Sequence, residues 1–307
     1  MKVFHTWEEA EASMVCGGAI TVGNFDGVHM GHQQVLAELV EHAQAVGGAS
    51  IVVTFEPHPR AVLYPEEAPR RLCHVYERLQ YLEAAGVDAV LLLKFNKDLA
   101  AWTAEKFSRA LYAAFSFQHM HVGYDFAFGR DRQGHVDDLR ALGDAEGFTV
   151  SEAAAFEMLD AVVSSSRIRS AIEAADLLLA EKLLGRKYSI SGEVLHGDKR
   201  GRQMNFPTAN LDVADLAHPP VGIYAVQASV GTQQWMGAAY LGYRPTFQGR
   251  TLLLETHLLD ADVDIYGQSL KVEFVQRIRE DRSFTGADDL AVQIAKDCDA
   301  ARKILSN

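Results

Sequence analysis

The 307-residue chain is long enough for two domains of ordinary size, and its 48% hydrophobic and 23% charged residues are typical of a soluble globular protein. Its 29 basic and 41 acidic residues give a net charge of −12, which argues against non-specific nucleic-acid binding and against a tRNA-handling role. Cys16, Cys73 and Cys298 are scattered and odd in number, so they indicate neither a disulfide framework nor a zinc ribbon.

Residues 1–10 include Glu8 and Glu9 and lack the apolar stretch of a secretion signal. The longest purely aliphatic run, residues 89–93, is far shorter than the ~20 residues that span a bilayer. We therefore expect a cytoplasmic protein with no membrane segment.

The first predicted element is a β-branched strand over residues 19–22 that ends at Gly23. A helix follows His32, because apolar residues at 35, 36, 39, 40 and 43 fall on one helical face. Gly23, Gly27 and Gly31 leave room for a ligand to approach the backbone between strand and helix. A glycine-rich turn that leads to the positive end of a helix dipole predicts a phosphate site.

Two histidines at this turn indicate the kind of phosphate chemistry. No Lys-Ser/Thr pair follows the last glycine, and the G-x-G-x-x-G spacing is absent, which excludes a Walker loop and a dinucleotide fold. His29 and His32 could donate hydrogen bonds to the α-phosphate of a nucleotide as pyrophosphate leaves. The alternative is a glycine-rich turn with two surface histidines. A zinc site at this pair lacks a third ligand at metal spacing.

Further strands are predicted over residues 50–55 and 88–93, with helices over 71–85 and 103–115, the latter capped by Thr103. Two prolines end the strand at 50–55 and present His58 at its carboxyl edge, where ligands of α/β sheets bind. The alternating pattern predicts a doubly wound, Rossmann-like parallel sheet.

After a histidine-rich stretch at 119–121, residues 124–134 alternate aromatics with glycines and predict a strand and a tight loop. The alternative for this segment is a basic hairpin tip carrying Arg130 and Arg132. Further on, the hydroxyls of residues 164–166 open a helix predicted to run past residue 179 on one inner face. Arginines in its first turn oppose the helix dipole, a conflict that a bound polyphosphate would resolve.

The pattern changes near residue 186. Short strands are predicted over 188–195, 223–230, 235–240, 251–259 and 270–274, followed by a closing helix over 287–305. Turns rich in Gly, Asp and Pro separate the strands, which predicts a small antiparallel barrel. The sequence therefore predicts two domains, residues 1–186 and 187–307.

Three features of the second half carry chemistry. Residues 196–202 form a basic loop that could cover phosphates. Thr208 and Asn210 offer hard oxygen ligands for Mg²⁺ carried by ATP. Glu255 interrupts an apolar strand and could take a proton from a hydroxyl that attacks the γ-phosphate. The alternative for Glu255 is a strand residue that faces solvent.

Several motifs together resemble the bacterial bifunctional riboflavin kinase/FAD synthetases. In the first half these are G-N-F-D-G-V-H-M-G-H (residues 23–32), a match to F-x-P-H-P (55–59), a match to G-x-D-F-x-F-G (123–129), and a match to I-S-S-T-x-I-R (163–169). In the second half they are residues 192–210, 222–224, 244–247, 254–260 and 266–267. The resemblance covers essentially the whole chain.

The resemblance implies an FMN adenylyltransferase domain of the nucleotidyltransferase superfamily followed by a riboflavin kinase barrel. It implies Mg²⁺, ATP, riboflavin, FMN and FAD as ligands, and a monomer or weak homo-oligomer. The implied catalytic residues are His29, His32, Arg169 and Glu255. The implied nucleotide and phosphate ligands are Gly23, Asn24, Phe25, Asp26, Gly27, Gly31, His58, Ser164, Ser165, Ser166, Gly192, Lys199, Gly201, Arg202, Thr208 and Asn210. Thr208 and Asn210 are the implied metal ligands, and Asp125, Phe126, Phe128 and Arg279 the implied flavin ligands.

Two departures from the family pattern concern the kinase. Asn205 stands where the family usually has glycine, and Tyr240 and Tyr243 stand near R-P-T-F, where smaller or polar residues are commoner. One hypothesis is thus a bifunctional enzyme, and a second is an adenylyltransferase whose barrel only binds flavin. A third is a non-catalytic flavin sensor or partner-binding protein.

Overall fold

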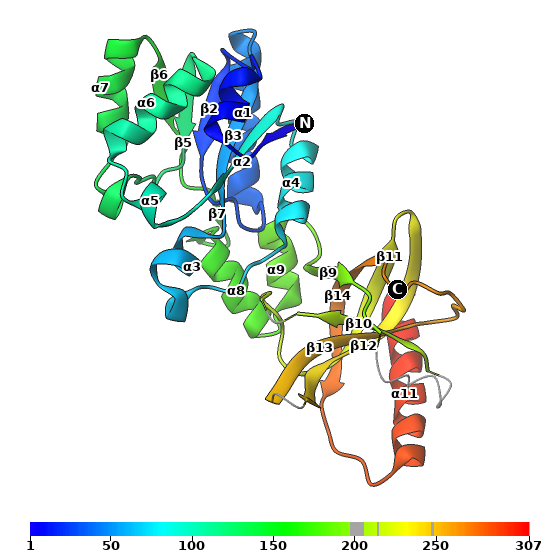
Figure 1. Cartoon of the computed structure of the whole chain (residues 1–307). Helices are drawn as coiled ribbons and strands as arrows, with labels where there is room; N and C mark the ends of the chain where they lie inside the picture. The colour runs from blue at the N-terminus through cyan, green and yellow to red at the C-terminus, as the bar shows by residue number, and fades with distance from the viewer. Residues whose placement is uncertain (197–205, 214, 247–248, 307) are drawn as a thin grey trace. The chain divides into compact units, whose positions relative to one another are not determined.

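The computed structural model describes residues 1–196, 206–213, 215–246 and 249–306. The chain divides into two compact units (Figure 1). One comprises Met1–Pro69 and Val75–Ser164, and the other comprises Arg70–His74 and Ser165–Asn307. A compact unit and a functional domain need not coincide, so the boundary near residue 186 stays a prediction.

The first unit contains a six-stranded sheet, parallel throughout, in the order β1-β4-β3-β2-β5-β6. Its strands are β1 Lys2–Phe4, β2 Ala19–Val22, β3 Ser50–Glu56, β4 Ala89–Lys94, β5 His119–Val122 and β6 Thr149–Glu152. Its helices are α1 Trp7–Ala12, α2 Met30–Ala45, α3 Pro59–Leu63, α4 Val75–Ala84, α5 Lys97–Ala100, α6 Ala104–Phe115 and α7 Val136–Glu146. The predicted doubly wound sheet is confirmed.

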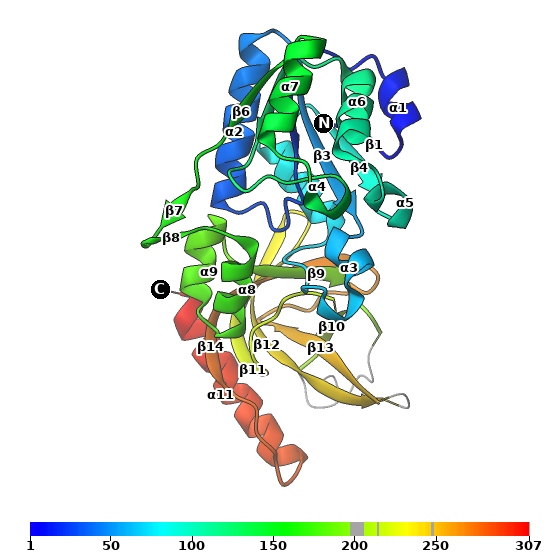
Figure 2. The same ribbon diagram turned by 90° about the vertical axis from the view of Figure 1, so that its left-hand side faces the viewer.

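Helices cover both faces of this sheet (Figure 2). One apolar cluster joins α1, α6 and α7 to the sheet, and another joins α2 and α4 to the opposite face. Successive residues of β4, such as Val90 and Leu91, belong to different clusters because strand side chains alternate between faces. Burial on both faces explains why β2, β3 and β4 are almost continuously apolar.

The strand order reverses at β2, which lies between β3 and β5. Ligands of open parallel sheets bind beyond the carboxyl ends of the strands at such a switch point. The glycine-rich turn after β2 leads into α2 at this position. The topology therefore brings the predicted phosphate turn to the place where the fold binds ligands.

Three local expectations in the first half need correction. The helix predicted over 71–85 begins only at Val75, because Arg71 is extended and forms a parallel bridge with Leu216. The aromatic segment 124–134 forms no strand beyond one bridge between Phe128 and Gly134, and contains the short 3₁₀ helix η2 Arg130–Arg132. The long helix after residue 164 is two helices, because Ala175 takes a left-handed φ of 59° between them.

The remaining elements of these parts are short. A further 3₁₀ helix, η1, spans Pro65–Glu67, and a small hairpin pairs β7 Glu157–Met158 with β8 Ala161–Val162. The two helices that follow are α8 Ser165–Glu173 and α9 Leu177–Leu184. Gly185 ends α9 with a φ of 73°, as the predicted end of the helical stretch requires.

The second unit contains six antiparallel strands in the order β10-β13-β12-β11-β14-β9. They are β9 Ser189–Glu193, β10 Thr208–Asp212, β11 Gly222–Val230, β12 Gln233–Thr246, β13 Gly249–Leu258 and β14 Ser269–Glu280. A bridge between Leu195 and Asn210 links the chain after β9 to β10, so the sheet forms a nearly closed barrel. The predicted barrel is confirmed, although β10 was not among the expected strands.

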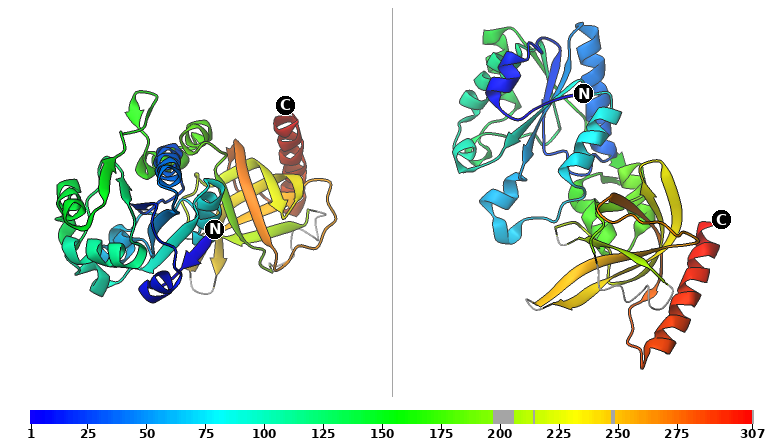
Figure 3. Two further views of the ribbon diagram at one scale, coloured as in Figure 1. Left: turned by 90° about the horizontal axis from the view of Figure 1, so that it is seen from above. Right: turned by 45° about the vertical axis from the view of Figure 1, so that its right-hand side comes forward.

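The closing helix α11 spans Ala287–Leu305, the predicted bounds, with Asp288 and Asp289 in its first turn. Cys298 and Ala301 of α11 pack against Ala225 and Ala238, so the helix lies along the outside of the barrel (Figure 3). None of the helices in the described part of the chain has the length and apolar character that crossing a membrane requires.

Candidate active sites

The turn after β2 has an unusual backbone. Phe25, Gly27 and Val28 have φ angles of 48°, 78° and 38°. Left-handed conformations cost little at glycine, but a β-branched residue such as Val28 rarely adopts one. Strain of this kind persists only where the surrounding structure holds it, and it often marks a ligand site.

His29 and His32 are brought together at the start of α2, as the sequence predicts. His29 is the N-cap, and its Nδ1 accepts a hydrogen bond of 3.2 Å from the His32 backbone N–H. The two rings stack with centroids 3.6 Å apart. Because Nδ1 of His29 accepts, a neutral His29 ring carries its proton on Nε2.

His32 is held in its neutral form. Removal of the ring from water and the adjacent His29 lower its pKa well below the ordinary value. Its buried Nδ1 has no hydrogen-bond partner among the described residues. The pair therefore offers hydrogen bonds to a phosphate at neutral pH rather than two full positive charges.

Arg78 of α4 is a site residue that the sequence analysis missed. It is 5% exposed and donates hydrogen bonds of 3.0 Å to the carbonyl oxygens of Asn24 and Phe55 and to the Glu56 carboxylate. It thus ties the glycine-rich turn to the end of β3. No motif marks this arginine, and only its burial identifies it.

Other predicted nucleotide ligands lie in this turn or after β3, and their surroundings differ. A side chain at Gly23 would come within 2.9 Å of the Phe25 ring, so this glycine makes room for Phe25. A Cβ at Gly31 would meet the His29 ring at 3.4 Å, an ordinary contact. Asp26 is buried at 7% exposure, and His58 caps α3 through its Nδ1, which accepts from Arg60 N.

The predicted flavin ligands of the first unit differ in exposure. Phe128 is buried in the apolar core with Phe107, and Phe126 stacks on it with centroids 5.1 Å apart. Asp125 is exposed. Phe126 and Asp125 are therefore accessible to a ligand, whereas Phe128 is part of the apolar core.

The serine–arginine motif lies at the start of α8. Ser164 precedes the helix, and Ser165 and Ser166 are in its first turn. Arg169 donates a 2.6 Å hydrogen bond from Nε to the carbonyl oxygen of Arg70. Ser165, Ser166 and Arg169 belong to the second compact unit, whereas Ser164 and the histidine pair belong to the first.

In the barrel, several predicted kinase residues are directly opposite one another on neighbouring strands and form a row across the sheet. Asn210 of β10 is opposite Glu255 of β13, which is opposite Tyr240 of β12. Tyr240 is opposite Ile223 of β11, which is opposite Arg279 of β14. Directly paired residues project from the same face of a sheet, so these side chains share one side of the barrel.

Asn210 and Thr208 occupy alternate positions of β10 and also share this face. Asn210 is 5% exposed, and its buried Oδ1 accepts no hydrogen bond from the described residues. An unpaired buried carbonyl oxygen next to a hydroxyl and a carboxylate fits the oxygen ligands that Mg²⁺ prefers.

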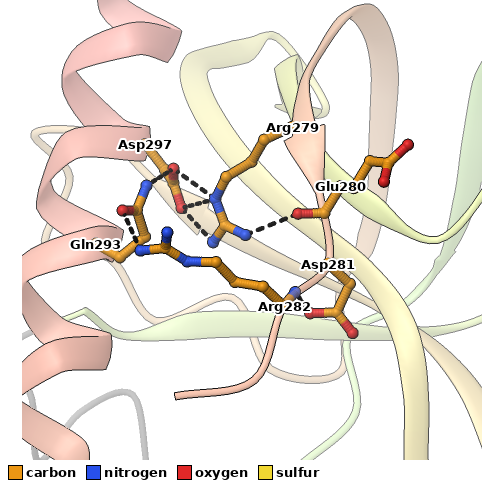
Figure 4. A network of polar contacts seen from close by, with 6 residues as sticks. All are labelled: Arg279, Glu280, Asp281, Arg282, Gln293 and Asp297. Carbon is orange, nitrogen blue, oxygen red and sulfur yellow. Dashed lines mark hydrogen bonds and ion pairs between the residues drawn. The ribbon is translucent and has the colours of Figure 1, made fainter. Parts of the chain in front are cut away.

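Arg279 makes a bidentate ion pair with Asp297 of α11, with contacts of 2.8–3.1 Å (Figure 4). Gln293 donates to the same carboxylate at 2.7 Å and accepts a hydrogen bond from Arg282. Asp297 is 4% exposed. Arg279 therefore joins β14 to the closing helix, and its predicted contact with flavin or phosphate stays a prediction.

The remaining predicted residues of the barrel show few contacts that bear on the kinase site. Lys199, Gly201, Arg202 and Asn205 lie outside the described residues. Gly192 has ordinary space around its Cβ position, nearest to Leu211 at 3.7 Å. The Tyr240 ring lies over Gly242, where any Cβ would collide with it, and Tyr243 is 48% exposed.

Comparison with known proteins accounts for both parts of the chain. Residues 12–167 match the family model described as FAD synthetase, and residues 184–305 match the one described as riboflavin kinase. A solved structure described as a macrolide-efflux protein from Streptococcus pneumoniae superposes with a TM-score of 0.85 at 28% identity. It covers 98% of this chain and 99% of that one.

Curated relatives match almost end to end and carry the name bifunctional riboflavin kinase/FMN adenylyltransferase. The Pseudomonas fluorescens protein is 44% identical over 94% of this chain and 93% of its own length. The Haemophilus influenzae protein is 40% identical over 95% of each, and the Escherichia coli K12 protein 39% identical over 94% and 92%. The chain belongs to the bifunctional riboflavin kinase/FMN adenylyltransferase family.

Proposed function

We propose that this protein makes both flavin cofactors: it phosphorylates riboflavin with ATP to give FMN, and transfers AMP from a second ATP to FMN to give FAD and pyrophosphate. The observation that carries this function is the match of two transferase family models to successive parts of one chain. The geometry of the histidine pair and of the barrel row supports it at the level of residues.

In the adenylyl transfer, the FMN phosphate is already an anion and attacks the α-phosphorus of ATP without a general base. The chain has to align the reactants and stabilise charge as pyrophosphate leaves. The Nε2 proton of His29 and the His32 ring, both at the N-terminus of α2, supply hydrogen bonds to that charge. Ser166 and Arg169 are proposed as further phosphate ligands.

In the kinase reaction, a hydroxyl of the riboflavin side chain attacks the γ-phosphorus of ATP. Glu255 accepts the hydroxyl proton as the new O–P bond forms and ADP leaves. Thr208 and Asn210 would hold Mg²⁺, which neutralises phosphate charge when bound. The support for this metal is the unpaired, buried Oδ1 of Asn210 beside Glu255.

The proposal includes small-molecule substrates only, with no nucleic acid or membrane as partner. The acidic net charge of −12 supports the first exclusion. A cytoplasmic location and a monomer or weak homo-oligomer are part of the same proposal.

The second hypothesis, an adenylyltransferase with an inactive barrel, loses support because residues 184–305 match the riboflavin kinase family model and Glu255 is present. The third hypothesis, a non-catalytic flavin sensor, loses support for the same reason and because the paired histidines are retained.

The test is to supply purified protein with riboflavin, ATP and Mg²⁺ and to follow FMN and FAD separately by chromatography. FAD formed from riboflavin is the expected result. FAD formed only when FMN is supplied would leave the adenylyl transfer and overturn the kinase. Tight FAD binding without turnover would overturn both.

A further inference from the structure

A cluster of three histidines lies in the first unit at the opposite end of the sheet from the nucleotide turn. His119 and His121 alternate along β5 and share its face, while Met120 and Val122 enter the apolar core on the other. His42 lies in the last turn of α2. His119 pairs with Ala19 at the start of β2, whereas the glycine-rich turn follows the end of that strand.

The three rings are close enough to share a ligand. One nitrogen from each of His42, His119 and His121 can be chosen so that all three lie within 4.8 Å of one another. The His42 ring centroid lies 4.0 Å from that of His119 and 5.4 Å from that of His121. Glu38, one turn before His42 on α2, brings its Oε2 to 2.8 Å from His121 Nε2.

His121 is buried, and each of its ring nitrogens has a polar neighbour. The residue is 2% exposed, and its Nε2 makes no properly directed hydrogen bond with any described residue, even though Glu38 lies close by. Its Nδ1 contacts the Ser151 hydroxyl at 2.7 Å. A buried imidazole with one nitrogen held by a hydroxyl and the other beside a carboxylate is suited to metal binding, because the hydroxyl orients the ring and the carboxylate can join it as a ligand.

His119 is oriented in a similar way. Its Nδ1 contacts the Thr149 hydroxyl at 2.7 Å, and its Nε2 contacts Ser151 at the same distance. One of these nitrogens would exchange its hydroxyl for a metal, and the other hydroxyl would remain as an outer-shell partner. Thr149 and Ser151 thus orient both strand histidines from the adjacent strand β6.

We propose that His42, His119 and His121, with Glu38 as the fourth ligand, bind Zn²⁺ in a structural site that joins the end of α2 to β5. Three imidazoles and one carboxylate suit Zn²⁺ and are a poor set for Mg²⁺, which prefers oxygen. Zinc–nitrogen bonds of about 2.1 Å place tetrahedral nitrogens about 3.4 Å apart, so the cluster contracts on binding.

The experiment uses the full, untagged chain stripped with a chelator and kept in excess Mg²⁺. Zn²⁺ is titrated against a chromophoric competitor, and Co²⁺ absorption reports the ligand types. We expect one tight Zn²⁺ per chain, a raised Tm, and a tetrahedral Co²⁺ spectrum without a thiolate charge-transfer band. A thiolate band would assign the metal to Cys16 or another cysteine and overturn the proposal.

Variants locate the site. His42→Ala and Glu38→Gln are the variants expected to fold, because both side chains are only half-buried on α2. His42→Ala is expected to weaken Zn²⁺ binding by at least about 100-fold, the upper end of the effect of losing an outer-shell partner. Glu38→Gln is expected to weaken it by about tenfold or more.

The matched control is His5→Ala, which removes an exposed histidine of the same unit and should leave the affinity unchanged. His32→Ala tests the stacked histidine pair at the other end of α2 as an alternative site. Unchanged binding in His42→Ala, loss of binding in His32→Ala, or no Zn²⁺ bound by the wild-type chain would each overturn the proposal.

Discussion

The two units of this chain build their proposed phosphate sites by different means. The parallel sheet offers a strained turn, a helix N-terminus and two stacked histidines, and the proposed reaction there requires no general base. The barrel uses side chains from neighbouring strands, with Asn210 and Glu255 directly opposite each other. The difference matches the nucleophiles, because a phosphate anion needs no base whereas a sugar-alcohol hydroxyl does.

Glu255→Gln is the substitution that should separate the two sites most strongly. It keeps the shape of the side chain and removes the proposed base, so riboflavin kinase kcat is expected to fall by about 10³-fold. FMN adenylylation, measured with FMN supplied directly, should stay at the wild-type rate.

The control for Glu255→Gln is Glu273→Gln, which removes a carboxylate of the same barrel that pairs with Lys271. It should leave both activities near wild type. A kinase that remained fast in Glu255→Gln would show that another group takes the proton.

His29→Asn tests the proposed site of the parallel-sheet unit. Asparagine still caps the helix but cannot place a donor where His29 Nε2 lies, so the adenylylation kcat should fall by about 10²-fold. Flavin affinity and kinase turnover should change little. Steady-state kinetics with FMN and with riboflavin distinguish the two outcomes.

His135→Asn is the matched control, because His135 is the N-cap of α7 in the same unit. Its adenylylation rate should equal that of the wild type. Equal losses in both variants would mean that a general disturbance of the unit, not lost contact with phosphate, explains the effect of His29→Asn.

Local signals made much of the fold predictable. Thr103 caps α6 at the expected residue, and α11 has the expected bounds, because capping residues and apolar periodicity act within a few residues. The strand β10 was missed because its sequence, T-A-N-L-D, is short and polar. It becomes a strand only by pairing with β13.

The motif residues of the candidate sites could be predicted, but their supports could not. Arg78 is recognisable only from the three groups that it binds, which come from other segments. His42 and the histidines of β5 meet only because α2 packs across that strand. Such contacts depend on tertiary structure, and no spacing in the sequence marks them.

Arg78→Met tests how far the strained turn depends on its support. The substitution leaves the carbonyl oxygens of Asn24 and Phe55 without this donor and Glu56 without its cation. The free energy of unfolding should fall by about 2–3 kcal/mol, measured by urea denaturation. Adenylylation should weaken more than the kinase.

Arg109→Met is the control for Arg78→Met, since Arg109 is exposed and pairs with Glu105 and Glu146 at the surface. It should lower the free energy of unfolding much less than Arg78→Met does, because exposed ion pairs contribute little to stability. Equal destabilisation by the two substitutions would contradict a special role for the buried arginine.

The smallest expected effect concerns the pH dependence of stability. Burial and His29 lower the pKa of His32 in the folded state, so the unfolded chain binds more protons below the ordinary pKa of 6.5. The contribution of His32 to the free energy of unfolding is therefore fully present above pH 6.5. It is lost as the pH falls below this value, by at most about 1.4 kcal/mol per pH unit. His32→Gln should flatten the fall in unfolding free energy between pH 7 and pH 5.5, whereas His5→Gln, at an exposed position, should not.

If both variants followed the wild-type curve, His32 would be free to take up a proton in the folded state. The histidine pair would then bind phosphate as a cation, as a conventional charged site does.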